Sequence, residues 1–150
     1  MYEKLLRETE HHEIDTYEKP MSEKIKGLYS DKVVLINQNI DSNVEKTCIL
    51  AEELGHYHTS SGNILDQKKL INRKQEKKAR NWAYKRLVPI SKIIKAYNSG
   101  IKNNYELASF LGVTEEFLVE ALIRYKEKYG LTYETEQFII SFEPLIIKQK

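Results

Sequence analysis

Residues 50–56 read Leu50-Ala51-Glu52-Glu53-Leu54-Gly55-His56 and place two carboxylates and an imidazole close together near the middle of the chain. On an α-helix, residues four apart lie on the same face, so Glu52 and His56 can reach one metal ion. Glu53 can serve as a general base that takes a proton from water. The stretch therefore predicts a helix that carries a small hydrolytic metal site.

The spacing matches the metallopeptidase motif H-E-x-x-H except at its first position, where Glu52 replaces histidine. A carboxylate oxygen is an accepted Zn²⁺ ligand. A site richer in oxygen is harder, so Mn²⁺ or Fe²⁺ would compete more effectively there. The same letters also occur in ordinary acidic helices, and by itself the stretch leaves that alternative open.

The motif lies in a longer predicted helix over about residues 43–58. Asp41 or Ser42 can cap its start, and Glu45 can complete a capping box if Ser42 is the cap. Apolar and small residues cover much of the helix, so its polar cluster would need partners or a metal. Gly55 costs about 1 kcal/mol relative to alanine inside a helix, which indicates close approach of another segment.

The flanking sequence predicts further helices and strands. Before the motif we expect a short helix over about residues 2–13 and then a strand, turn and strand over residues 25–29, 30–32 and 33–37. After it we expect a helix over about residues 68–87, ended by Pro89. In that helix Glu76 shares an apolar stripe with Ala79 and Ala83. Glu76 is therefore a third candidate ligand, although a solvated glutamate paired with a lysine fits equally well.

Three other side chains, Asp66, His58 and Tyr57, are secondary candidates. Asp66, in the loop after the motif helix, is the alternative third ligand. His58 lies about 200° around a continuous helix from His56, so it could share the metal only if the helix unwinds at Tyr57. An oxyanion-binding or supporting role for His58 also stays open.

Composition narrows the class of protein. The chain has 150 residues, 41% hydrophobic and 31% charged, as expected for one soluble globular domain. No apolar run approaches the roughly 18 residues of a membrane span. A net charge of +2 gives the whole chain no strong attraction to nucleic acid or anionic membrane. The N-terminus lacks the apolar stretch of a secretory signal, so we expect a cytoplasmic protein.

Several conspicuous residues are expected to be structural. The single cysteine, Cys48, lies among apolar neighbours and is predicted to be buried, whereas His11 and His12 are predicted to be solvated. Residues 68–86 are rich in cations. Glu76 and the apolar stripe interrupt that pattern, which favours a solvated helix face over a nucleic-acid patch.

The C-terminal part reads as helices followed by β-prone sequence. Residues 103–125 resemble a helix-turn-helix, but the second helix opens with Glu115 and Glu116, which would repel phosphate. We therefore expect a helical hairpin that packs on the core or recognises a substrate protein. Residues 137–148 are β-prone, with Pro144 at an edge or turn, and are expected to close the domain.

Three separated groups of residues together resemble the ImmA/IrrE family of intracellular metallopeptidases, most closely over residues 10–90. They are Lys26 to Tyr29 with Val33 to Asn37, Leu50 to His58 with Gly62 to Asp66, and the spaced set Glu76, Ala79, Trp82, Ala83, Val88 and Pro89. The resemblance implies an α+β, zincin-like domain with a small β-sheet, an active-site helix and a C-terminal helical region. We expect one domain over residues 1–150, with the peptidase core in 1–90 and the helical hairpin and β-prone tail in 91–150.

Position by position, the resemblance implies Glu52, His56 and Glu76 as zinc ligands and Glu53 as general base. The departure is at Glu52, where the family pattern has histidine. Known substrates in the family are typically repressors or other transcription regulators of phages or mobile elements. The predicted function is a zinc-dependent endopeptidase that cleaves such a regulator. The alternative is an inactive antirepressor that binds the regulator without cleavage, and neither nucleic acid nor a membrane is an expected direct partner.

Overall fold

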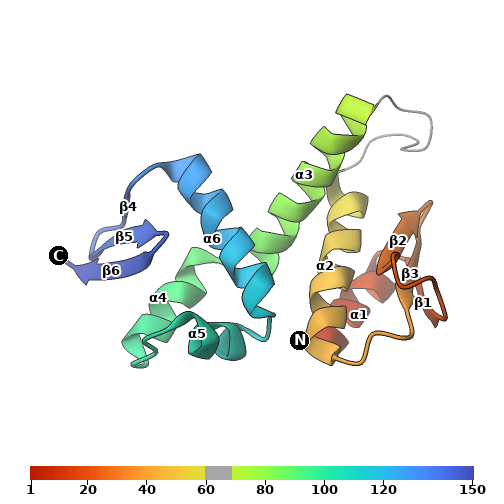
Figure 1. Ribbon diagram of the computed structural model, residues 1–150, viewed down its shortest axis with the longest axis horizontal. Helices are drawn as coiled ribbons and strands as arrows, with labels where there is room; N and C mark the ends of the chain where they lie inside the picture. The colour runs from red at the N-terminus through yellow and green to blue at the C-terminus, as the bar shows by residue number, and fades with distance from the viewer. Residues whose placement is uncertain (60–68) are drawn as a thin grey trace. The chain divides into compact units, whose positions relative to one another are not determined.

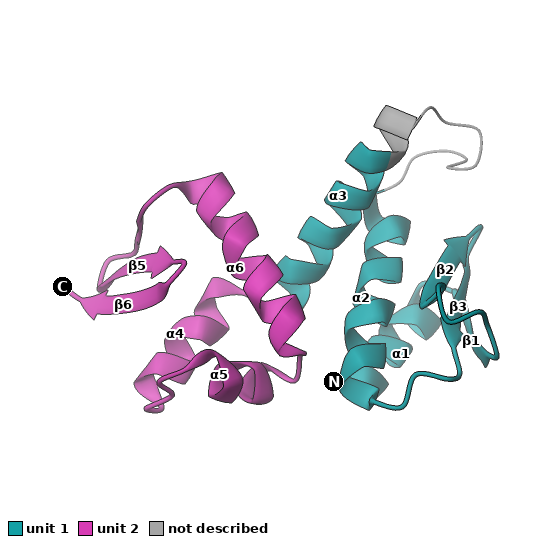
Figure 2. Ribbon diagram, viewed as in Figure 1, with its two compact units in different colours: residues 1–87 teal, residues 88–150 magenta. Residues whose placement is uncertain are grey.

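The computed structural model describes residues 1–59 and 69–150 (Figure 1). The chain divides into two compact units, Met1–Leu87 and Val88–Lys150 (Figure 2). Each unit combines three helices with a three-stranded sheet, so the predicted α+β class is confirmed. Within the described residues, no helix has the length and apolar character needed to cross a bilayer.

The first unit contains α1 (Tyr2–His11), β1 (Asp15–Lys19), β2 (Gly27–Ser30), β3 (Val33–Asn37), α2 (Asn43–Thr59) and α3 (Lys69–Leu87). The second contains α4 (Ile90–Asn98), α5 (Asn104–Leu111), α6 (Glu115–Tyr129), β4 (Tyr133–Glu134), β5 (Phe138–Phe142) and β6 (Leu145–Gln149). The predicted helix over residues 2–13, the motif helix and the helix before Pro89 are all present.

Strand β3 is the centre of the first sheet. It pairs in parallel with β1 and antiparallel with β2. Its β-branched residues favour extended backbone, and Val34 and Ile36 are fully buried on the side that faces the core. Asp31 and Lys32 both have positive φ, as in the two-residue turns that match strand twist. The predicted hairpin is therefore confirmed, and β1 is an additional strand that the sequence did not indicate.

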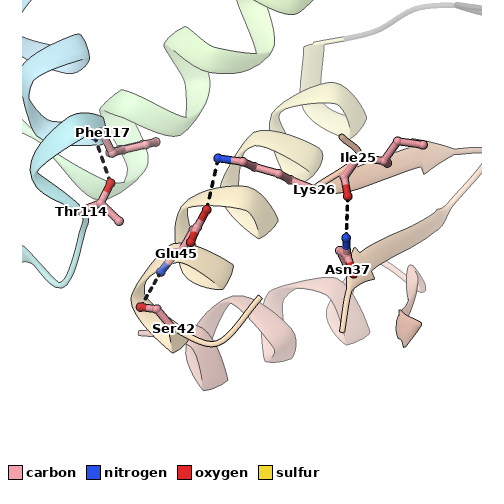
Figure 3. A network of polar contacts seen from close by, with 7 residues as sticks. All are labelled: Ile25, Lys26, Asn37, Ser42, Glu45, Thr114 and Phe117. Carbon is pink, nitrogen blue, oxygen red and sulfur yellow. Dashed lines mark hydrogen bonds and ion pairs between the residues drawn. The ribbon is translucent and has the colours of Figure 1, made fainter. Parts of the chain in front are cut away.

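Asn37, at the end of β3, fixes the segment that leads into β2. Its side-chain amide donates to the backbone carbonyls of Ile25 at 2.9 Å, Ser22 at 3.1 Å and Met21 at 3.3 Å. Figure 3 shows the bond to Ile25. Because Asn37 is only 3% exposed, these bonds satisfy a polar group that would otherwise be costly to bury. They hold β2 in register beside the motif helix.

The start of α2 has only half of the expected capping box. The Ser42 hydroxyl accepts a hydrogen bond from the backbone N–H of Glu45 at 3.3 Å (Figure 3). The Glu45 carboxylate forms an ion pair with Lys26 at 3.2 Å rather than returning to Ser42. Ser42 is thus the cap, and Glu45 links the helix to the segment before β2.

Helix α3 packs against α2 at Gly55. A Cβ atom added to Gly55 would lie 2.2 Å from the carbonyl oxygen of Ala79, a distance that atoms cannot adopt. Ala79 and Ala83 are fully buried, and Cys48 is buried as predicted. The close approach inferred from a glycine inside the helix is therefore confirmed.

The second unit has the predicted pair of helices within residues 103–125 and the predicted C-terminal strands. Gly112 has a φ of +73° and ends α5, and the Thr114 hydroxyl caps α6 by accepting from the N–H of Phe117 at 3.1 Å (Figure 3). Helix α4 follows directly after Pro89 and was not predicted. Phe138, Ile140 and Phe142 turn inward from β5 in the alternating pattern of a half-buried strand.

We predict that Gly55→Ala destabilises the protein by about 1 to 3 kcal/mol, the usual cost of inserting a methylene into a packed core. The added methyl would meet backbone, which cannot move aside as a side chain can. Urea unfolding measures the change. In an exposed helix the same substitution stabilises by about 1 kcal/mol, so a gain in stability would contradict the close approach.

Candidate functional site

The site is built around a contact between His56 on α2 and Glu76 on α3. The imidazole Nε2 lies 3.2 Å from a carboxylate oxygen of Glu76. His56 is buried, whereas the side chain of Glu76 is 51% exposed. The expectation that Glu76 lies fully on the buried stripe needs correction, because it sits one turn before Ala79 at the margin of the helix contact. From there its carboxylate reaches His56 while part of it stays hydrated.

Glu53 lies on the side of α2 that faces strand β2. The side chain is only 9% exposed, and a Cβ added to Gly27 would be 3.4 Å from its Cγ. Burial raises the pKa of Glu53 from 4.5 to about 7; the charge of His56 opposes this shift, and the charges of Glu52 and Glu76 add to it. A carboxyl group with a pKa near neutrality can both accept and return a proton.

The imidazole of His56 has one nitrogen in contact with Glu76 and one without a partner. Burial alone would lower its pKa, but the hydrogen bond that the imidazole donates to Glu76 and the negative charges of Glu76, Glu53 and Glu52 raise it above 6.5. The same hydrogen bond lowers the pKa of Glu76. Nδ1 is buried and has no hydrogen-bond partner among the described residues. Such an unsatisfied buried atom is a reason to look for a bound ligand.

The donor atoms of Glu52, His56 and Glu76 fit Zn²⁺ in their chemistry, since zinc accepts imidazole nitrogen and carboxylate oxygen. Glu52 lies half-buried on α2, and its charge acts on both Glu53 and His56. Within residues 1–59 and 69–150, however, no three His, Cys, Asp or Glu side chains are gathered around one point. The contact that the structure does show is the His56–Glu76 pair.

His58 lies apart from that pair. Helix α2 continues to Thr59, so the unwinding at Tyr57 that would bring His58 to the site does not occur. The His58 ring stacks on Trp82 of α3, with ring centroids 4.5 Å apart and an interplanar angle of 18°. Burial and the nearby charge of His12 lower the pKa of His58. Asp66, the alternative third ligand, lies outside the described residues.

His12 and Tyr57 complete an aromatic cluster around His58. The ring centroids are 5.0 Å apart between His12 and His58 and 5.2 Å apart between His12 and Tyr57. His12 is therefore half-buried rather than solvated, whereas His11 is exposed. The sequence did not reveal this cluster, because it depends on how α1 packs against α2. The close approach of Gly27 to the Glu53 side chain was also missed, although a glycine in a strand is a known sign of such an approach.

We predict that Glu53→Gln raises the free energy of unfolding of the metal-free protein by roughly 3 kcal/mol at about pH 8 and has little effect near pH 4. Folding raises the pKa of Glu53 from 4.5 to about 7. The stability linked to its proton is therefore present below pH 4.5 and is lost as the pH rises through 7. Urea unfolding after chelation, repeated across this range, measures the difference.

Glu23→Gln is the matched control, because Glu23 is exposed and lies outside the sheet and helices. It should follow the wild-type curve at every pH. Parallel curves for Glu53→Gln and the wild type would show that Glu53 does not retain its proton in the folded state.

Comparison with known proteins agrees with the residues that form the site. A family model described as the IrrE N-terminal-like domain, Peptidase_M78, matches residues 9–122. A comparison with curated proteins gives no match. The matched range contains the hairpin, the motif helix α2, α3, α4 and α5, and it ends within α6. Because it covers well over half of the chain, this protein belongs to the IrrE N-terminal-like family of metallopeptidases, the family that its motif residues resemble.

Proposed function

We propose that the chain is a metal-dependent endopeptidase with His56, Glu52 and Glu76 as metal ligands and Glu53 as general base. The contact between the buried His56 and the half-exposed Glu76 carries the proposal, because it joins two predicted ligands from separate helices at 3.2 Å. A Zn²⁺ ion at these ligands would lower the pKa of a water molecule toward about 7 and polarise the scissile carbonyl. Two acidic ligands make Mn²⁺ or Fe²⁺ plausible alternatives.

Glu53 moves the proton in this mechanism. Its carboxylate takes a proton from the attacking water and returns it to the leaving amine. A pKa near 7 suits both steps, since the group must hold the proton briefly and then release it. Burial beside β2 keeps bulk water away from the carboxylate.

The edge strand β2 is the proposed guide for the substrate. In the sheet order β1-β3-β2, only one side of β2 pairs with another strand within residues 1–59 and 69–150. An extended peptide added to the other side would form backbone hydrogen bonds and run past Glu53. Together with the motif helix and α3, this strand edge supports the proposal of a zincin-like peptidase domain.

The first unit would then be the peptidase core, and the second unit would help recognise the substrate. We propose an intracellular regulator of transcription, such as a repressor of a phage or mobile element, as the substrate class. The exchange of histidine for Glu52 favours one alternative, an inactive antirepressor that binds the regulator without cutting it.

Two substitutions of Glu52 test the ligand set. Glu52→Ala should lower zinc affinity at least tenfold, because it removes a ligand, whereas Glu52→His should match or exceed the wild type by restoring the usual motif. Elemental analysis of protein purified without added metal or chelator, followed by zinc titration, gives both results. If the wild type holds no transition metal and shows no zinc site, the enzymatic proposal fails.

A third variant, Glu53→Gln, tests the base. The metal-loaded wild type should cut one regulator encoded near its own gene at a defined site, as judged by mass spectrometry of the fragments. Glu53→Gln should still bind zinc but lose about 10² to 10⁴ in rate, the usual contribution of general base catalysis. Unchanged cleavage would remove Glu53 from the mechanism. Binding of the regulator without cleavage by the zinc-loaded wild type would favour the antirepressor.

A further inference from the structure

Helix α3 has a strongly uneven distribution of charge. Its sequence contains eight basic residues and one acidic residue, Glu76. The acidic residue is bound to His56 on the side that packs against α2. The sequence favoured a solvated face because Glu76 and the apolar stripe interrupt the cations. In the structure the half-exposed Glu76 contacts His56 at the margin of the helix contact, and the apolar stripe of Ala79 and Ala83 is buried.

Five cations form the exposed side of this helix, here called the α3 basic face. They are Arg73, Lys74, Lys77, Lys78 and Arg80. At about 100° per residue, Lys74, Lys77 and Lys78 lie on the side of the helix away from the buried Ala79 and Ala83, and Arg73 and Arg80 lie at the edges of this face. None of the five forms an ion pair with another residue in the described ranges.

The α3 basic face repels itself in the isolated protein. Arg73 and Lys77, like Lys74 and Lys78, are four residues apart, a spacing at which like charges destabilise a helix. A partner with regularly spaced negative charges would reverse this repulsion and release the counterions that the lysines and arginines attract.

We propose that the α3 basic face binds the phosphate backbone of duplex nucleic acid without reading its sequence. Three features favour this partner over an acidic protein. The face is rich in lysine, which protein interfaces avoid, and it carries no aromatic anchor. Trp82 is stacked on His58, and Tyr84 is buried, so neither is available to stack on unpaired bases. Backbone phosphates need only the charges that this face presents.

Binding is measured by fluorescence anisotropy of a labelled 20-base-pair DNA duplex and an RNA duplex of the same length, each in two unrelated sequences. We expect a Kd of about 10⁻⁴ to 10⁻⁶ M near physiological salt, equal for both sequences. The plot of log affinity against log salt should have a slope between about −3 and −4.5, as three to five neutralised phosphates require. DNA and RNA results together show which duplex the face prefers.

The decisive comparison uses two variants with the same net charge. Lys74→Gln, Lys77→Gln and Lys78→Gln together should weaken binding at least tenfold and reduce the salt slope by about 2 to 3. Lys4→Gln, Lys24→Gln and Lys95→Gln together remove three exposed cations elsewhere and should leave affinity nearly unchanged. Circular dichroism confirms that both variants fold.

Three outcomes would overturn the proposal: no binding to either duplex, equal losses in the two triple variants, or equally tight binding of a polyglutamate peptide of matched charge. Equal losses would mean that net charge, not α3, attracts the duplex. Peptide binding would assign the face to an acidic protein partner. The test needs no peptidase activity, so its result does not depend on the proposed catalytic function.

Discussion

The contact between α2 and α3 at Gly55 and Ala79 positions the candidate site. Gly55 directly precedes His56, and Ala79 lies one turn beyond Glu76, so the backbone approach brings the imidazole and the carboxylate together at 3.2 Å. Farther along α2, His58 stacks on Trp82 of the same partner helix. A side chain at position 55 would separate the helices, because the opposing atoms are backbone. The geometry of the site thus depends on the absence of a Cβ atom at position 55.

This packing places the ionisable side chains of Glu53 and His56 in a buried position. Glu76 contacts the His56 imidazole, burial raises the pKa of Glu53 to about 7, and the charges of Glu52, Glu53 and Glu76 raise the pKa of His56. Glu53 retains its proton because an unpaired buried charge would be costly, and His56 retains its proton because carboxylates lie nearby. A divalent cation would compensate the same excess of negative charge and would compete with protons for the same atoms.

Local patterns in the sequence were enough to predict the motif helix that carries Glu52, Glu53 and His56 and the hairpin of residues 25–37, because helix spacing and turn chemistry act between near neighbours. The apolar periodicity of the helix before Pro89 indicated Glu76 as a candidate. It did not indicate that the Glu76 side chain is half exposed, because periodicity does not show where the contact between two helices ends. Strand β1 reads Asp-Thr-Tyr-Glu-Lys and has no apolar alternation. It is a strand because it pairs in parallel with β3, and such long-range pairing leaves no local trace.

A charge of the α3 basic face acts on the candidate site on the other side of the helix. Arg80 belongs to the α3 basic face, and its charge helps to lower the pKa of Glu76, after the larger effect of the hydrogen bond with His56. This one cation, at the edge of the face, thus favours the ionised carboxylate that a metal ligand must be. The influence is modest, because Glu76 is half exposed and salt screens charges over about 10 Å. An anionic partner bound to that face would offset part of it, so occupancy of the face and ionisation of Glu76 are linked through the same charges.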